Sequence, residues 1–468
     1  MIAFFDLAPR GFHCVGSPVR IAILVLWMGA LACAAFDMRG YYITFMRTPT
    51  LDLPAWKQAM DCVRADGGNT VLLWMGGAFP SKKFPITWKY NTGHLNVQKN
   101  FAGKLIDYAH AQNIKVILGF TPFAYDGVNQ YPLEHPELKA TQRNGEPAKF
   151  WGMHSWGYNF CPAKEESQRF MLEYAREMVF EFYPNADGVL IESSDYAICY
   201  CTRCREKYYD NEFRFVARFS DELWKTKPGA IIVVFPHYFS GQKVPGFDVP
   251  AAKLPFDPRW TLVFTPHSAH LDSALLKRAA NSIAWDDAPT LGTPGKIQRA
   301  AERAKSAGIN GFVPSLEAFT FIPRPGEVGE TRTTSEPLKP FGFEWLPDGA
   351  MPFNELLVRV NRIAYREFSR NPDLRDPDFK NIVARELLDD PDAVDDLLFV
   401  QESWFFERTW YLASPITRPG NLTKEQREKY RPRVERIREI ERRWREREPQ
   451  LHRIAKFITD EWDAVAQR

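Results

Sequence analysis

Short apolar runs alternate with longer amphipathic stretches along most of the chain. The apolar runs are rich in β-branched residues and are bounded by polar loops, a pattern typical of strands that are buried on both faces. Eight such runs predict strands, at residues 40 to 45, 69 to 74, 114 to 120, 187 to 192, 230 to 236, 260 to 265, 282 to 287 and 309 to 317.

The stretches between the runs carry helix signals. Trp56, Met60 and Val63 are spaced to share one face of a helix. Asp52 stands where an N-cap is expected, and Pro54 falls in the first turn. The pattern therefore predicts that a helix follows the first strand.

The alternation of strands and helices predicts an α/β fold, a (β/α)8 TIM barrel over residues 38 to 325. An open doubly wound sheet is the competing fold, but no glycine-rich fingerprint follows the first strand. Residues 326 to 350 are rich in Pro and Gly and predict a loop or linker. Helical patterns over residues 351 to 468 predict a C-terminal α-helical domain, whose charged run at 423 to 450 alternates in sign and predicts a solvated helix.

The N-terminal segment predicts export. An apolar stretch that ends in small residues, "IAILVLWMGALACAAF", follows Arg20 and is short for a membrane span. Residues 1 to 34 are interpreted as a signal peptide or an N-terminal anchor, and no other integral membrane segment is predicted. We therefore expect an exported protein, which is periplasmic, at the cell surface or secreted.

Composition narrows the choice of partners. The 60 Lys and Arg residues nearly balance the 58 Asp and Glu residues, which argues against nucleic acid or an anionic membrane as the main partner. Aromatic residues make up 14% of the chain, and many of them fall beyond the predicted strand ends.

The C-terminal ends of barrel strands carry the chemistry of this fold, and here acids, imidazoles and indoles gather at those ends. Aromatic faces stack on sugar rings, whereas acids and His hydrogen-bond to hydroxyl groups, so we expect a carbohydrate substrate. The predicted substrate-binding residues are Trp74, Tyr125, Trp151, His154, Trp156, Asp195, His237, Tyr238, His267, Trp285 and Asp287.

Cleavage of a glycosidic bond needs two carboxyl groups that flank the bond. Glu192 is the first choice for the acid, because burial at the end of an apolar strand favours the protonated form of a carboxyl. The alternative is a carboxylate that binds a sugar hydroxyl or pairs with an Arg. Glu317, Asp286 and Asp287 compete for the second role, and no cofactor is expected for catalysis.

A cysteine cluster follows the fourth predicted strand. Cys199, Cys201 and Cys204 are spaced to present thiolates to one Zn²⁺, and either Cys161 or His154 is available as a fourth ligand. A disulfide is the competing interpretation, because an exported protein meets an oxidising compartment. We expect structural zinc or a disulfide that holds the loop after Glu192.

The stretch "YPNADGVLIESSDYAICYCTRCREKY", with a preceding Cys-Pro segment and helix, resembles the barrel core of exported bacterial glycoside hydrolases akin to the β-hexosaminidase and α-glucuronidase type. The resemblance covers about half of the chain. It implies hydrolysis of a glycosidic bond in an oligo- or polysaccharide, with Glu192 at the acid position. The resemblance does not extend to the Asp-Glu pair of the hexosaminidases, because Ile191 precedes Glu192.

Three functions compete at this point. The leading hypothesis is a glycosidase, either retaining or inverting, and the second is a non-catalytic carbohydrate-binding barrel. A metal-dependent hydrolase with a catalytic zinc ranks last, because the first strand carries no His-x-His pair.

Overall fold

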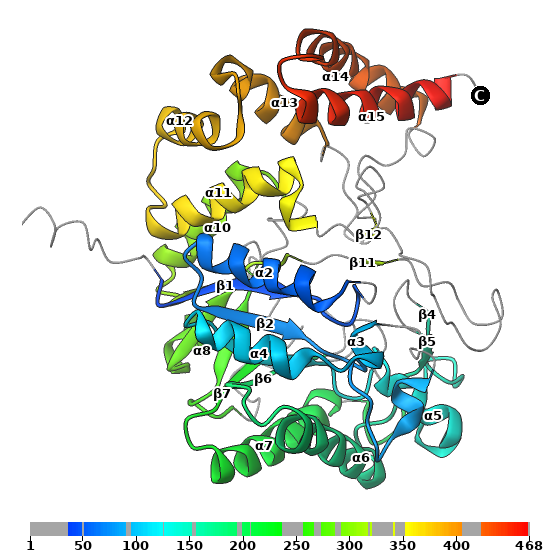
Figure 1. Cartoon of the computed structure of the whole chain (residues 1–468). Coiled ribbons are helices and arrows are strands. Elements are labelled where there is room, and N and C mark those ends of the chain that lie inside the picture. Colours follow the sequence, from blue (N-terminus) through cyan, green and yellow to red (C-terminus); the bar gives the residue numbers. More distant parts are fainter. Residues whose placement is uncertain are drawn as a thin grey trace, which may run out of the picture. The chain divides into compact units, whose positions relative to one another are not determined.

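Eight parallel strands form a closed barrel in the computed structural model (Figure 1). In chain order they are β1 Met38–Ile43, β2 Thr70–Trp74, β3 Lys115–Phe120, β6 Gly188–Glu192, β7 Ile231–Phe235, β8 Thr261–Phe264, β9 Asn281–Ala284 and β10 Gly311–Phe312. The barrel closes because β1 pairs with both β2 and β10. The eight predicted strands and the (β/α)8 barrel are therefore confirmed.

The structure describes residues 36–48, 51–89, 95–124, 126–151, 156–193, 199–205, 207–235, 256–265, 273–285, 292–316, 319–320, 340–341, 352–404 and 423–466. The predicted export segment lies outside these ranges. Residues Ala35–Arg468 form one compact unit, and the predicted boundaries within it stay a prediction.

The strands are buried on both faces because helices cover the outside of the barrel. Every residue of β2 and β6 is buried. The helix α2 (Leu53–Ala65) begins as predicted, since the Asp52 side chain accepts a hydrogen bond from the Ala55 backbone N–H at 3.1 Å. Trp56, Met60 and Val63 are buried on one face of α2. The other helices that connect barrel strands are α3 Leu95–Gln98, α4 Ala102–Ala111, α6 Glu165–Arg176 with a π-helical turn at Glu177–Phe182, α7 Tyr208–Thr226, α8 Ser273–Arg278 and α10 Pro294–Ser306.

Helix α11 (Leu356–Arg370) packs beside α10 on the outside of the barrel (Figure 1). The Tyr365 hydroxyl donates to the Phe312 carbonyl of β10 at 3.2 Å. Arg362 pairs with Asp66, the residue after α2, at 2.7 Å. Since α11 follows the last barrel strand and contacts both that strand and α2, it occupies the place of the eighth barrel helix.

In the part of the chain that the structure describes, α11 is followed by the helices α12 Asp376–Leu387, α13 Val394–Trp404, α14 Lys424–Arg443 and α15 Pro449–Ala466. The charged run is helical as predicted, and α14 buries a stripe formed by Val434, Ile437 and Ile440. Among the helices that the structure describes, none combines the length and the apolar character that a membrane crossing requires.

A long insertion between β3 and β6 stands beside the barrel mouth. A two-stranded antiparallel hairpin, β4 Lys149–Trp151 and β5 Trp156–Tyr158, forms part of it. The insertion also contains the short helical elements η3 Val128–Gln130, α5 Tyr131–Glu134 and η4 Pro136–Leu138. Short 3-10 helices elsewhere are η1 Pro85–Thr87 after β2, η8 Pro352–Asn354 before α11 and η9 Pro391–Ala393 before α13. The short strand β11 Phe319–Thr320 pairs with β12 Pro340–Phe341.

Candidate active site

Glu192 is the last residue of β6, at the C-terminal end of the fourth barrel strand. It is 9% exposed, and the Tyr42 hydroxyl lies 3.4 Å from its Oε2. Tyr42 belongs to β1, which is not a neighbour of β6 in the barrel. The contact therefore crosses the interior of the barrel, so Glu192 points inward at the mouth.

Aromatic rings surround this carboxylate. The ring of Tyr42 lies 5.9 Å from Trp74 and 6.1 Å from Trp285, between ring centroids. Phe235, which pairs in register with Glu192, lies 5.4 Å from Trp285. Trp285 is 7% exposed and Trp74 is fully buried. The mouth therefore has an aromatic wall contributed by the ends of four strands, β1, β2, β7 and β9.

A buried ion pair lies at the same end of the barrel. Arg47, shortly after β1, places Nη2 2.9 Å from Oδ2 of Asp126, and the Trp74 indole N–H donates to the same oxygen at 2.5 Å. Asp126 is fully buried and Arg47 is 6% exposed. A carboxylate held by a guanidinium and an indole is fixed in position, and it ties the loop after β3 to β1 and β2.

The backbone around Asp126 is tightly constrained. Gly76 has a φ of +44°, and a Cβ at this position would lie 2.6 Å from the Asp126 Cβ. Phe123 and Asp126 also take positive φ values, 62° and 60°, although neither is a glycine. Such conformations cost about 1 to 3 kcal/mol each and persist where the surrounding structure fixes them, which is common at functional sites.

The residue after Glu192 is held from two sides. The Ser193 backbone N–H donates to the Phe235 carbonyl at 2.9 Å, and its hydroxyl donates to Glu212 of α7 at 2.7 Å. Glu212 is buried. These contacts fix the chain where it leaves β6 and thereby help to orient Glu192.

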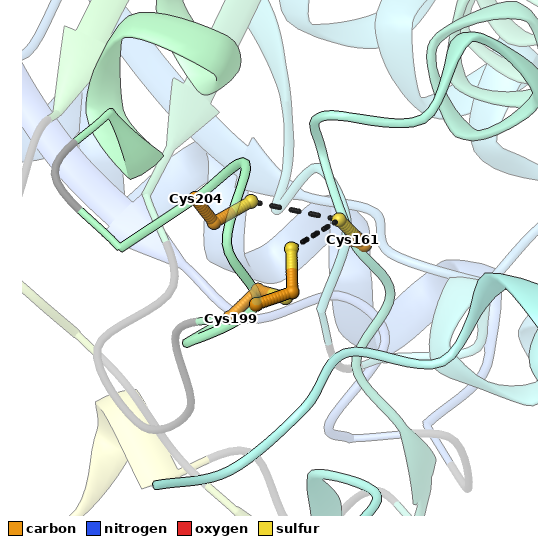
Figure 2. Close-up of side chains that lie close together, drawn as sticks. Cys161, Cys199 and Cys204 are labelled. Carbon is orange, nitrogen blue, oxygen red and sulfur yellow. Dashed lines mark hydrogen bonds between the residues drawn. The ribbon is translucent and has the colours of Figure 1, made fainter. Parts of the chain in front are cut away.

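The four clustered cysteines lie together beside the mouth. Cys161 comes from the insertion after β3, and Cys199, Cys201 and Cys204 come from the loop after β6; Figure 2 shows the Cys199 and Cys204 side chains pointing toward Cys161. The Cys161 sulfur is 3.6 Å from that of Cys201 and 3.5 Å from that of Cys204. All four sulfur atoms lie within 4.8 Å of one another, and none forms a disulfide. This arrangement could hold a metal ion.

Hydrogen bonding separates the acidities of these thiols. Contacts from the thiols of Cys161 and Cys204, and then from the Thr141 backbone N–H, lower the pKa of the Cys199 thiol. The contact with Cys199 raises the pKa of the Cys161 thiol, and the contacts with Cys161 and then Cys199 raise the pKa of the Cys204 thiol.

The predicted catalytic and substrate-binding residues divide into three groups. Glu192, Trp74 and Trp285 lie together at the mouth, although the Trp74 indole N–H is used by Asp126. Trp151 and Trp156 are register partners in the β4–β5 hairpin. The other predicted residues lie outside the described ranges: Tyr125, His154, Asp195, His237, Tyr238, His267, Asp286, Asp287 and Glu317.

Four residues of the mouth were not among the predicted site residues, namely Tyr42, Phe235, Arg47 and Asp126. Tyr42 occupies an inward position of β1, and the alternation of strand residues could have indicated it. Arg47 and Asp126 stand in loops, and the local sequence carries no sign that they pair.

Comparison of the sequence with protein families and with curated proteins finds no match. Among solved structures, the chain is similar to a GH138 enzyme targeting pectin rhamnogalacturonan II, with a TM-score of 0.52 and 12% identity over 83% of this chain and 46% of that chain. It is also similar to a β-N-acetylhexosaminidase from Bacteroides fragilis, with a TM-score of 0.49 and 14% identity over 75% of this chain and 70% of that chain.

The chain thus spans less than half the length of the GH138 enzyme. At this level of identity the likeness concerns the fold. The chain has the (β/α)8 fold found in glycoside hydrolases, and the resemblance predicted from the sequence is confirmed to that extent.

Proposed function

We propose that this protein is a glycoside hydrolase in which Glu192 is the general acid. The observation that carries the proposal is the buried Glu192 carboxylate at the end of the fourth strand, contacted across the barrel mouth by Tyr42. Active sites of this fold lie at the C-terminal ends of the strands. A carboxyl that points inward there, within an aromatic wall, is placed to meet a sugar.

In the proposed reaction, Glu192 donates its proton to the glycosidic oxygen as the bond to the anomeric carbon breaks. The second carboxyl either attacks the anomeric carbon or activates a water. Glu317, Asp286 and Asp287 are the candidates for this role, and they lie outside the described residues. A separation of about 5 to 5.5 Å from Glu192 would give retention, and about 6.5 to 9.5 Å would give inversion.

The substrate class in this proposal is an oligo- or polysaccharide. The GH138 neighbour targets pectin rhamnogalacturonan II, and the sequence resembles β-hexosaminidases and α-glucuronidases. Pectic oligosaccharides, N-acetylhexosaminides and glucuronides therefore come first in a substrate screen. Export, proposed from the N-terminal apolar segment, suits a protein that acts on polymeric sugars.

The test compares turnover of the wild type and of Glu192→Gln on that glycan panel. Glu448→Gln is the matched control, because Glu448 is also buried but accepts the Asp390 backbone N–H among the C-terminal helices. We expect Glu192→Gln to lose about a hundredfold to ten-thousandfold in kcat and still bind the sugar, whereas Glu448→Gln keeps its turnover.

Two results would contradict the proposal. Equal turnover in Glu192→Gln and the wild type would remove Glu192 from the chemistry. Sugar binding without turnover of any glycan by the wild type would favour the non-catalytic carbohydrate-binding barrel instead.

A further inference from the structure

We propose that Cys161, Cys199, Cys201 and Cys204 bind one Zn²⁺ in a structural site. The proposal is independent of the glycosidase proposal, because it rests on the cysteine cluster and its surroundings and not on Glu192. The four ligand atoms lie within 4.8 Å of one another and come from two segments of the chain, and Figure 2 shows three of the four side chains, Cys161, Cys199 and Cys204.

The sulfur separations fit a shared metal better than a disulfide. In a tetrahedral site with Zn–S bonds of about 2.3 Å, neighbouring sulfur atoms are about 3.8 Å apart. The Cys161 sulfur lies 3.6 Å from that of Cys201 and 3.5 Å from that of Cys204. A disulfide would bring two sulfur atoms to about 2.05 Å. A small expansion of the cluster would therefore accommodate the ion.

The surroundings of the sulfur atoms also suit thiolate ligands. The Thr141 backbone N–H donates to the Cys199 sulfur at 3.4 Å, and the Asn211 side-chain amide donates to the Cys204 sulfur at 3.9 Å. Donors of this kind offset the negative charge of coordinating thiolates and orient them. Cys201 and Cys204 also share a tight turn, in which the Cys204 N–H donates to the Cys201 carbonyl at 2.9 Å.

The ligand set indicates a structural role for the ion. Four cysteines complete a tetrahedral shell and leave no coordination position for water or substrate. Cys161, Cys199 and Cys204 are buried and Cys201 is half-buried. The site would therefore be closed.

The ion would join two loops that flank the barrel mouth. Cys161 follows the β4–β5 hairpin, whereas the other three ligands follow β6 and Glu192. Backbone hydrogen bonds already connect these loops, since the Tyr200 N–H donates to the Thr141 carbonyl at 2.7 Å. Zinc would fix this connection and hold the segment between Glu192 and α7 in place.

The test measures metal in the full-length protein, purified under reducing conditions without added metal. We expect one zinc per chain by elemental analysis. Cys204→Ser is expected to lose most of this zinc, whereas Cys62→Ser keeps it, because Cys62 is half-buried on α2 and lies outside the cluster. Absence of zinc from the wild type, or full retention in Cys204→Ser, would overturn the proposal.

A second measurement covers the case in which Cys204→Ser does not fold. Wild-type protein exchanged with Co²⁺ is expected to show thiolate-to-cobalt charge transfer and the visible bands of a tetrahedral centre. Thiol labelling of unreduced, unfolded protein separates the alternatives. Two or four thiols that label only after reduction would indicate disulfides, and iron in place of zinc would overturn the choice of metal.

Discussion

The ion pair between Arg362 and Asp66 should contribute much of the stability with which α11 packs on the barrel. Two guanidinium nitrogens of Arg362 donate to the Asp66 carboxylate, at 2.7 and 3.0 Å, and the Tyr41 hydroxyl donates to it at 2.8 Å. The side chains of Arg362 and Asp66 are 12% and 6% exposed. Because both are buried, removal of Arg362 leaves a carboxylate with a single remaining donor in a poorly hydrated position.

We predict that Arg362→Met lowers the free energy of unfolding by about 3 to 5 kcal/mol at pH 8, which is more than a hundredfold in the ratio of folded to unfolded protein. Methionine keeps most of the apolar stem of Arg362, so the loss reports the unpaired charge more than lost packing. The assay is urea unfolding followed by tryptophan fluorescence.

The loss of stability in Arg362→Met should depend on pH. Burial raises the pKa of Asp66 in the folded protein, and Arg362 opposes this rise. In Arg362→Met the pKa of Asp66 in the folded protein therefore rises further. Folded Arg362→Met then keeps the Asp66 proton over a range of pH in which the unfolded chain, with an Asp pKa of about 3.9, has released it. The unfolded chains of the two proteins titrate alike, so the loss begins above the raised pKa that Asp66 has in the folded wild type and grows toward pH 8.

The double variant Asp66→Asn, Arg362→Met is the control, because a neutral side chain removes the unpaired charge. It should be more stable than Arg362→Met at pH 8, with little dependence on pH. A loss for Arg362→Met that is the same at pH 5 and pH 8, or that the second substitution does not relieve, would refute this reasoning.

Two further predictions concern the mouth and the loop after β2. Tyr42→Phe removes the hydroxyl that lies 3.4 Å from Glu192. It should lower kcat about tenfold on any glycan that the wild type cleaves, with KM and melting temperature nearly unchanged. A change in KM alone would assign Tyr42 to sugar binding instead. Glu177→Ala removes a buried carboxylate that accepts hydrogen bonds from the Ser81 hydroxyl at 2.5 Å and from the Lys82 N–H at 2.7 Å. It should lower the free energy of unfolding in urea by about 3 kcal/mol, and Glu177→Gln should lower it by less. A loss below about 1 kcal/mol in Glu177→Ala would contradict this prediction.

The strands of the barrel could be predicted because their signal is local. Each strand is a short run of apolar residues, and helices cover its outer face, so burial appears directly in the sequence. Glu192 was found for the same reason, since it ends such a run. The Cys199, Cys201 and Cys204 spacing is local as well. The sequence left Cys161 and His154 open as the fourth ligand, and the structure brings the Cys161 sulfur to the other three.

The contacts that build the mouth could not be predicted, because they join distant segments. Tyr42 and Glu192 are 150 positions apart, and Arg47 and Asp126 are 79 positions apart. Helix α11 also makes contacts with residues that are far away in the sequence. Its sequence predicts a helix, but carries no sign that Arg362 contacts Asp66 across 296 positions. Only the closed barrel brings these residues together.

The central claim is that Glu192 donates a proton to the leaving group, and a leaving-group comparison tests it most directly. The measurement is the kcat of Glu192→Gln, relative to the wild type, on an unactivated glycan and on an aryl glycoside of the same sugar with an acidic phenol. A phenol of low pKa departs without protonation, so we predict a loss of at least about a hundredfold on the glycan and a much smaller loss on the aryl glycoside. Equal losses on the two substrates would contradict the role of Glu192 as the acid.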